Sequence, residues 1–223
     1  MCVSVVIPVL NEAAALPKLL ESMRRLGAEI LFVDGGSSDA TVEMLEASGL
    51  RWISAPRGRG SQMNAGAAAT AGTTLMFVHA DTELPFEALG GVRRAVRNGA
   101  VGGSFGLRLD TRSPLLRLVA ATITVRSRIT GVATGDQALF VTRKAFDRLG
   151  GFSALPLFED VDFSRRLKRE GPVTRLPLAV VTSARRWRRG GTLRTILRMW
   201  ILKALYYGGV DPALLARRYQ AVR

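Results

Sequence analysis

The sequence has a single cysteine, Cys2, and a single histidine, His79, among 223 residues. These absences exclude a disulfide scaffold and metal sites built from clustered cysteine and histidine ligands. Any metal would therefore be a hard cation held by oxygen, which indicates Mg²⁺ or Mn²⁺. Disorder is excluded as the main state, because apolar residues make up 48% of the chain, an ordinary share for a globular protein. We expect one compact domain over residues 1–223.

Acidic residues are also scarce, which leaves a formal net charge of +14 at pH 7. An excess of this kind indicates an anionic partner: nucleic acid, a phosphorylated metabolite or an acidic membrane surface. The charge does not select among the three. Nearly all of it is arginine, and a genome rich in G and C would explain part of this excess. Basic residues crowd the C-terminal end, which predicts a strongly positive field there.

The chain has no long apolar run. Residues 3–10 are apolar but contain Pro8 and follow no basic stretch, so they predict a strand and not a signal peptide. Arg194, Arg198 and Lys203 divide the best candidate for a membrane span, which would need ~20 apolar residues. We expect a cytoplasmic protein. Tryptophan and tyrosines among arginines in residues 193–207 add the hypothesis of a peripheral site on the inner face of the membrane, with core packing as the alternative.

Apolar, β-branched runs without polar alternation predict strands covered on both faces of a parallel sheet. Such runs occupy residues 3–9, 30–33 and 75–78, and helical patterns separate them at 11–25, 38–47 and 61–71. Pro85 suits the first turn of a fourth helix. The N-terminal half thus reads β-α-β-α-β-α-β, and the fold class is α/β with a mixed, mainly parallel sheet flanked by helices.

The second half is less regular and predicts mixed topology. We expect strands at residues 101–109, 138–142 and 173–181. Helices are expected at residues 113–128 and 159–169, with a short helix that ends at 150–151. Two C-terminal helices follow at 193–207 and 212–219. Ligands of an open parallel sheet bind beyond the carboxyl ends of its strands. Segments with polar residues, 8–12, 34–39 and 79–82, lie at the ends of three of these strands, so we expect the three segments to meet in space.

A basic, glycine-rich loop at residues 57–61 (RGRGS) precedes a helix start, where amides and guanidinium groups suit phosphate. Arg59 is favoured over Arg57, and a solvated loop is the alternative. The loop is not a dinucleotide fingerprint, since Met63 stands where a third glycine would be needed.

Several motifs, in register over most of the chain, resemble the family 2 glycosyltransferases of the GT-A fold. They are residues 4–12 (SVVIPVLNE), 34–41 (DGGSSDAT), 79–82 (HADT) and 150–152 (GGF), followed by Glu159 and Asp160. Residues 57–60 (RGRG) and 63–66 (MNAG) are similar to the small, soluble, radical-SAM-associated "transferase 2" proteins of that family. The resemblance implies a single Rossmann-like GT-A domain. Residues 1–100 would bind the nucleotide-sugar, 101–190 would form the acceptor and catalytic half, and 191–223 would form C-terminal helices.

The resemblance also implies a metal-dependent, inverting transfer of a hexosyl group from a UDP- or GDP-linked donor, with Mn²⁺ or Mg²⁺. A departing diphosphate accumulates negative charge, which a cation held by a carboxylate stabilises. Asp81 is the expected metal ligand, although His79 replaces the first aspartate of the family's Asp-x-Asp triplet. Asp34 would bind the base or ribose. The expected donor-side residues are Pro8, Val9, Leu10, Glu12, Asp34, Arg59, Asn64, His79, Ala80 and Asp81.

On the acceptor side, the resemblance assigns Asp160 as the general base that takes the proton of an acceptor hydroxyl. Asp136 is the reserve candidate. The other expected acceptor-side residues are Gly135, Asp136, Glu159, Arg186 and Trp187. The acceptor is unidentified, and a lipid is one candidate. Simple helix-start or turn roles are the alternatives for the acidic residues at positions 34, 81 and 159.

Two other functions fit parts of the pattern. A nucleotidyltransferase acting on a sugar phosphate would need a glycine-rich basic loop after the first strand, where this chain has residues 8–12 (PVLNE). A basic nucleic-acid-binding protein is favoured by the charge alone, and no motif supports specific nucleic-acid recognition. The sequence does not predict an oligomeric state.

Overall fold

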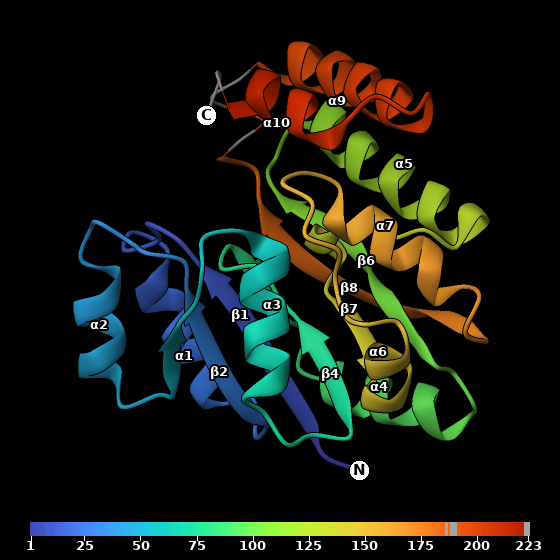
Figure 1. Ribbon diagram of the computed structural model, residues 1–223. Helices are drawn as coiled ribbons and strands as arrows, with labels where there is room; N and C mark the ends of the chain where they lie inside the picture. Colours follow the sequence, from blue (N-terminus) through green and yellow to red (C-terminus); the bar gives the residue numbers. More distant parts are fainter. Residues whose placement is uncertain (186, 188–190, 221–223) are drawn as a thin grey trace.

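The computed structural model describes residues 1–185, 187 and 191–220 (Figure 1). Its centre is one eight-stranded sheet with the strand order β3-β2-β1-β4-β7-β6-β8-β5. The strands are β1 (Val3–Val9), β2 (Glu29–Asp34), β3 (Trp52–Ser54), β4 (Thr74–Phe77), β5 (Thr82–Glu83), β6 (Gly102–Asp110), β7 (Leu139–Thr142) and β8 (Val173–Ser183). The helices are α1 (Leu16–Arg24), α2 (Thr41–Ser48), α3 (Arg59–Ala68), α4 (Ala88–Arg97), α5 (Pro114–Thr130), α6 (Arg143–Arg148), α7 (Glu159–Leu167), α9 (Thr192–Tyr207) and α10 (Pro212–Gln220), with a 3₁₀ turn η1 (Gly135–Gln137).

The N-terminal strands form the parallel part of the sheet. β1 lies between β2 and β4 and is parallel to both, and β2 is parallel to β3. Val9 pairs with Asp34, and Asp34 pairs with Ser54, so three strands end at the same level. The carboxyl ends of these strands therefore form one edge, and the loops that follow them are neighbours.

Helices cover both faces of the sheet, which explains why β1 is apolar at consecutive positions. Val5 and Ile7 lie in a buried cluster with α1, α2 and α4. Val6 lies in the cluster on the other face, with Met63 of α3 and Phe163 of α7. A strand buried on both faces has no solvent side to mark with polar residues.

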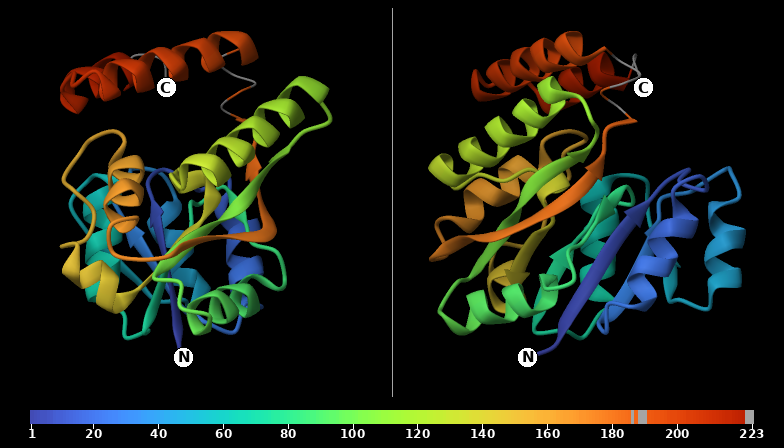
Figure 2. Two further views of the ribbon diagram at one scale, coloured as in Figure 1. Left: turned by 90° about the vertical axis from the view of Figure 1, so that its right-hand side faces the viewer. Right: turned by 180° about the vertical axis from the view of Figure 1, so that it is seen from behind.

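The C-terminal half adds antiparallel pairs and confirms the predicted mixed topology. β7 is antiparallel to β4 and to β6, β5 is antiparallel to β8, and β6 is parallel to β8. A register shift interrupts the long β6–β8 pair between Ser104 and Gly106. The two strands rise together toward α5 (Figure 2). The single-domain α/β fold predicted from the sequence is confirmed.

The C-terminal helices pack on the loop that precedes α7. Leu202 of α9 and Leu215 of α10 share a buried cluster with Phe158 and Val161. Figures 1 and 2 show α9, α10 and one end of α5 at the same end of the molecule. No helix within the described residues has both the length and the apolar character that crossing a bilayer requires.

Most predicted elements are confirmed, and two helix starts are wrong. The first helix begins at Leu16 and not at Asn11, because Asn11 has a left-handed backbone (φ 54°) and a turn separates it from the helix. The fourth helix begins at Ala88, whose N–H bonds the carbonyl of Pro85 in a turn, so Pro85 precedes the helix. The short β5 and the turn η1 are additional elements.

Candidate active site

The loops after β1 and β2 are fastened to each other by hydrogen bonds. The Asn11 side-chain oxygen accepts from the Ser38 N–H at 2.8 Å, and the Asn11 N–H donates to Ser37 Oγ at 2.9 Å. Asp34 is 2% exposed, and its Oδ2 accepts from the N–H groups of Gly36 at 2.8 Å and Ser37 at 3.0 Å. In this structure, Asp34 therefore organises its own loop, which is the turn-forming role given above as its alternative.

Gln62 of α3 joins the ends of β1 and β2 by hydrogen bonds. Its Nε2 donates to the carbonyls of Val9 at 2.8 Å and Val33 at 2.7 Å, and the residue is 2% exposed. Gly35 leaves room for this side chain, since a Cβ at that position would lie 2.9 Å from the Gln62 amide carbon. Gln62 is a supporting residue that sequence reasoning missed. Its only signal is a large polar residue within a helix of small ones.

Asn64, predicted on the donor side, lies in the same helix and anchors the loop before α7. Its side-chain oxygen accepts from the Phe152 N–H at 2.8 Å, and its side-chain nitrogen donates to the Phe152 carbonyl at 2.9 Å. Both ends of the amide are engaged, which assigns Asn64 a structural role in joining α3 to the Gly-Gly-Phe motif. Its place on the donor side stays a prediction.

Arg59 and Glu159, predicted on opposite sides of the site, form an ion pair with 2.8 Å between Nε and Oε1. Glu159 is 1% exposed, and this burial raises the pKa of its carboxyl group, although the charge of Arg59 opposes the shift. The pair joins the first turn of α3 to the first turn of α7. The guanidinium that was expected at phosphate thus already has one carboxylate partner.

Asp160 lies beside η1 and His79. The residue is 8% exposed, and its Oδ2 accepts from the Gly135 N–H at 2.6 Å while Oδ1 accepts from the Val161 N–H at 2.7 Å. A Cβ on Gly135 would lie 2.5 Å from His79 Nε2 and 3.3 Å from Asp160 Oδ2. Three predicted site residues therefore meet, and only a glycine fits between the imidazole and the carboxylate.

The Asp81 segment is tied to η1 through the end of β8. Asp81 accepts from the Ser183 N–H at 3.1 Å through its backbone carbonyl. The next residue, Thr82, has its hydroxyl 2.9 Å from that of Thr182, which also donates to the Asp136 carbonyl at 3.2 Å. Asp81 and Asp136 thus flank the same end of β8, although 54 positions separate Thr82 from Asp136 in the chain.

The donor set around Asp81 does not form a closed metal site. Within the described ranges, no group of three or more histidine, cysteine, aspartate or glutamate side chains could hold an ion. Mg²⁺ in enzymes is commonly held by one or two carboxylates together with substrate phosphates, and it keeps several waters. The half-buried Asp81 therefore suits a cation that binds together with a diphosphate. The side chains of the protein alone do not form a complete set of ligands for it.

The other described residues predicted for the site belong to β1, to the loops after β1 and β4 and to the segment after β8. Pro8, Val9 and Ala80 are buried, and Leu10 is half-buried. Glu12 forms an ion pair with Arg185 at 3.2 Å, which joins the β1 loop to the segment after β8. Trp187 is half-buried against the cluster that contains α1 and α4. Arg186 lies outside the described residues.

Proteins with an open α/β sheet generally bind ligands beyond the carboxyl edge of the parallel strands, and the acidic loops of this chain follow that edge. The match to a family model is more specific. Residues 4–153 match Glycosyl transferase family 2. The chain belongs to glycosyl transferase family 2. This confirms the resemblance drawn from the motifs, while the radical-SAM-associated subtype stays a prediction. No curated protein matches the chain.

Solved structures of low sequence identity share the fold. TarS of S. aureus in complex with UDP-GlcNAc is 17% identical with a TM-score of 0.67, over 82% of this chain and 58% of that one. A mannosyltransferase of Pyrobaculum calidifontis in complex with GDP-Man and Mn²⁺ is 19% identical with a TM-score of 0.67, over 86% and 61%. Glucosyl-3-phosphoglycerate synthase of Mycobacterium tuberculosis, with Mn²⁺, UDP and its product, is 18% identical with a TM-score of 0.59, over 81% and 70%. The chain thus spans about 60% of these first two solved chains, of which the TarS chain is residues 1–349, and 40% of a longer TarS structure.

Proposed function

We propose that this protein transfers a sugar from a nucleotide-sugar donor to an acceptor hydroxyl. The observation that carries the proposal is the meeting of Asp160, Gly135 and His79 at the carboxyl edge of the sheet, next to the Asp81 segment. Membership of glycosyl transferase family 2 supports it. The UDP-GlcNAc and GDP-Man bound by proteins of the same fold support a UDP- or GDP-linked donor.

On the donor side, the base and ribose would bind against the hydrogen-bonded loops that follow β1 and β2. Both Asp34 oxygens already accept bonds from its own loop, so Asp34 would bind a nucleotide hydroxyl by exchanging the Ser37 hydroxyl for it. Asp81 would hold Mn²⁺ or Mg²⁺ together with the diphosphate, and the cation would supply positive charge against the departing diphosphate. His79, whose ring faces Gly135 beside Asp160, would contact the reacting end of the donor.

On the acceptor side, Asp160 acts as the general base. The Gly135 N–H holds Oδ2, so the carboxylate has a defined orientation before an acceptor arrives. The acceptor hydroxyl loses its proton to Asp160 as its oxygen attacks the anomeric carbon from the face opposite the nucleotide. The configuration at that carbon is inverted. Asp136 remains the reserve candidate for the base.

A thermal-shift panel of UDP and GDP, each with and without Mn²⁺, tests the assignment, because a ligand of the native state raises Tm. We expect one diphosphate to raise Tm only with Mn²⁺, and we expect Asp81→Ala to abolish the rise. Asp160→Ala should keep the rise and lose release of the diphosphate from the matching nucleotide-sugar. Asp147→Ala removes an exposed carboxylate of α6 and should change neither. If Asp160→Ala loses binding and turnover together, its role as the base is refuted.

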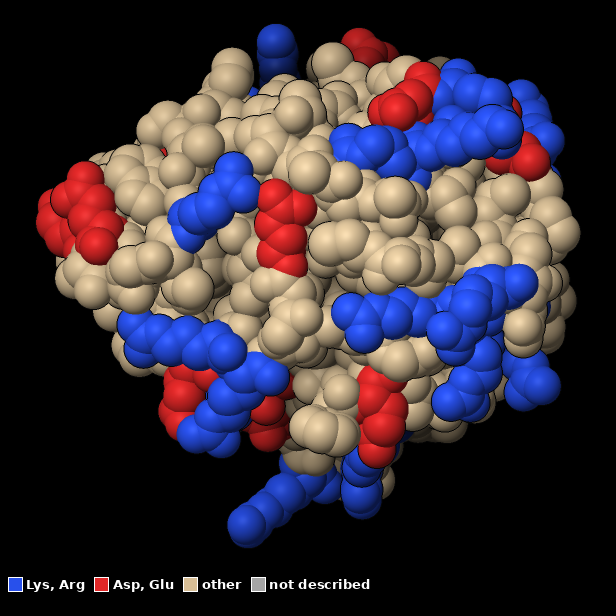
Figure 3. Space-filling view, turned by 90° about the horizontal axis from the view of Figure 1, so that it is seen from below, with Lys and Arg blue, Asp and Glu red and all other residues tan. Residues whose placement is uncertain are grey.

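We further propose that the end of the molecule formed by α5, α9 and α10 rests on an anionic lipid bilayer. Leu193, Leu197 and Trp200 of α9 are 71%, 62% and 73% exposed, and Leu118 and Ile129 of α5 are 61% and 79% exposed. None of these helices contains an acidic residue, whereas each contains arginine. The opposite end, seen from below in Figure 3, carries side chains of both signs. Apolar side chains among arginines suit an anionic bilayer.

A further inference from the structure

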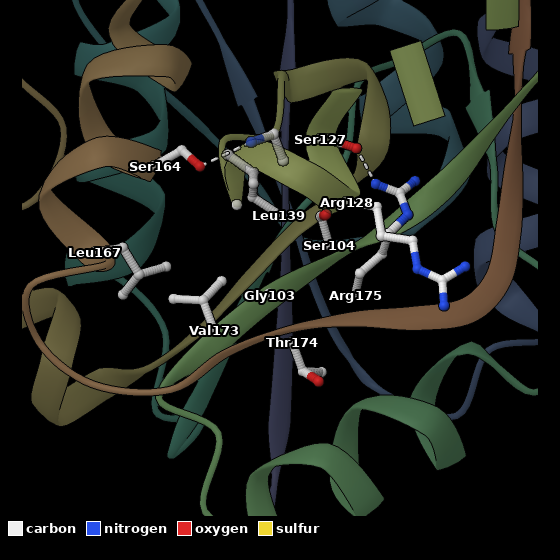
Figure 4. Close-up of a pocket in the computed structure, with 12 residues that line it drawn as sticks. Gly103, Ser104, Ser127, Arg128, Leu139, Ser164, Leu167, Val173, Thr174 and Arg175 are labelled. Carbon is white, nitrogen blue, oxygen red and sulfur yellow. Dashed lines mark hydrogen bonds between the residues drawn. The ribbon is translucent and has the colours of Figure 1, made fainter. Parts of the chain in front are cut away.

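A cavity of about 230 Å³ lies between α5, α7 and the strands β6 and β8 (Figure 4). Its lining includes Ser104, Ser127, Arg128, Ser164 and Arg175. None of the residues assigned above to the donor, the acceptor or the metal lines it. Ligand binding in this cavity does not depend on the proposed function, and only an effect of the ligand on Asp160 rests on it.

Arg175 and Arg128 are the charged residues in the lining of this cavity, and Arg175 is the more buried of the two. One guanidinium nitrogen donates to the Phe105 carbonyl at 2.8 Å and another donates to Ser127 Oγ, and both acceptors are neutral. Burial lowers the pKa of Arg175, and the charges of Arg126 and Arg128 lower it further. Within the part of the chain that the structure describes, no carboxylate forms an ion pair with Arg175. A half-buried cation without a counter-ion destabilises the folded protein.

Neighbouring groups add unused hydrogen-bond capacity. Arg126 donates one bond to the Val132 carbonyl at 3.2 Å, but its Nη2 is buried without a partner among the described residues. Ser104 is 5% exposed, and it lines the cavity. Figure 4 shows the Arg175 and Arg128 guanidinium groups on the same side of the cavity. Positive charge and hydrogen-bond donors thus surround the cavity, and no carboxylate forms an ion pair with Arg175 among the described residues.

We propose that this cavity binds a phosphate group, either inorganic phosphate or the phosphomonoester of a small metabolite. Guanidinium groups present paired donors that match phosphate oxygens. The Ser104 hydroxyl adds a donor from another direction, which favours a tetrahedral anion over a planar carboxylate. At about 230 Å³, the cavity is smaller than the roughly 300–1,000 Å³ of pockets that enclose drug-sized ligands, which disfavours a whole nucleotide.

The cavity shares a loop with the candidate base. Ser164 accepts from the Ala133 N–H at 2.9 Å through its hydroxyl, and Asp160, one helical turn earlier in α7, accepts from the Gly135 N–H at 2.6 Å. Bound phosphate would therefore stiffen the loop that orients Asp160. This gives the site a means of acting on catalysis from outside the donor and acceptor positions.

Calorimetric titration of the full chain with sodium phosphate, at ionic strength held constant with sodium chloride, tests the proposal. We expect saturable binding that is at least tenfold weaker in Arg128→Gln and in Arg175→Gln. Arg128 is exposed, so its variant should fold even if the Arg175 variant does not. Arg97→Gln makes the same charge change at an exposed residue of α4 and should bind as the unmodified protein does. Equal affinity in all variants would overturn the proposal.

A second set of titrations identifies the source of the phosphate. Tighter binding of glucose 6-phosphate than of inorganic phosphate indicates a phosphomonoester, and the reverse order indicates the free ion. Asp81→Ala serves as the control for the donor site and should leave phosphate binding unchanged. Loss of binding in Asp81→Ala with retention in Arg128→Gln would move the phosphate to the donor site and refute the cavity. Failure of both phosphates to bind would refute it as well.

Discussion

At the residue scale, the acidic side chains of the candidate site are held by backbone N–H groups and by one arginine. Asp34 and Asp160 each accept backbone bonds, and Glu159 faces Arg59. The motifs selected these positions from the sequence, and their assignment to one site stays a prediction. They did not indicate the partners, because Arg59 and Glu159 lie 100 positions apart and a buried ion pair leaves no local pattern in the chain.

The Arg59–Glu159 pair predicts a stability that depends on pH. Arg59→Met leaves the buried Glu159 without a counter-ion. Because 35% of the Arg59 side chain is exposed, we expect a loss of about 2–3 kcal/mol near pH 7.5, below the ~3–5 kcal/mol of a fully buried pair. Urea denaturation measures this loss.

The sign of the pH effect follows from the direction of the pKa shift. Burial raises the pKa of Glu159 above its ordinary value, and loss of the Arg59 charge raises it further. A carboxyl group with a raised pKa in the folded state favours folding when it is protonated. The deficit of Arg59→Met should therefore be largest at pH 8 and shrink toward pH 5. The double variant Arg59→Met, Glu159→Gln should lack this trend, and a deficit that grows on acidification would contradict the explanation.

At the element scale, the small residues of α3 let this helix pack closely against the sheet. The alanine- and glycine-rich segment was predicted correctly as a helix, but its composition did not reveal how closely it approaches the sheet. Gly66 lies over β1 and β2, where a Cβ would come within 2.3 Å of Val6 Cγ1 and 2.9 Å of Val33 Cγ2. This close packing brings Gln62 under the strand ends and Asn64 against Phe152.

Gly66→Ala should therefore destabilise the protein. Val6 and Val33 are fully buried and β-branched, so they cannot turn away from an added methyl group, and overpacking of this kind costs about 1–3 kcal/mol. Gly90→Ala in α4 is the matched control, because a Cβ there meets nothing within 4 Å. It should stabilise the protein by roughly 0.5–1 kcal/mol through helix propensity. Equal effects of the two substitutions in urea denaturation would contradict the close-packing argument.

The elements that sequence patterns failed to predict correctly depend on distant contacts. The sequence of residues 11–15 resembles a helix start. Asn11 instead adopts a left-handed backbone conformation, and its side chain accepts a hydrogen bond from Ser38 in the loop after β2. The two-residue β5 exists only because β8 lies beside it. Hydrophobic periodicity reports burial within one segment, and it carries no information on which segment lies opposite.

At the scale of the whole molecule, the +14 charge is unevenly distributed. The helices α5, α9 and α10 contain arginines and a lysine without an acidic residue. Composition alone left three anionic partners open. The structure adds apolar side chains to the same surface, and these favour a bilayer over nucleic acid, because nucleic acid would place phosphates and not acyl chains against them.

Vesicle sedimentation tests this surface. We expect the protein to bind vesicles rich in phosphatidylglycerol, to bind neutral phosphatidylcholine vesicles far less, and to lose binding at high salt. Full burial of a large apolar side chain contributes about 1.5–3 kcal/mol, so Trp200→Ser should weaken binding at least about tenfold. Phe86→Ser is the matched control: Phe86 is 95% exposed but precedes α4, at the opposite end of the molecule (Figure 1). Unchanged binding in Trp200→Ser, or equal binding to neutral vesicles, would rule out this end as the membrane-facing surface.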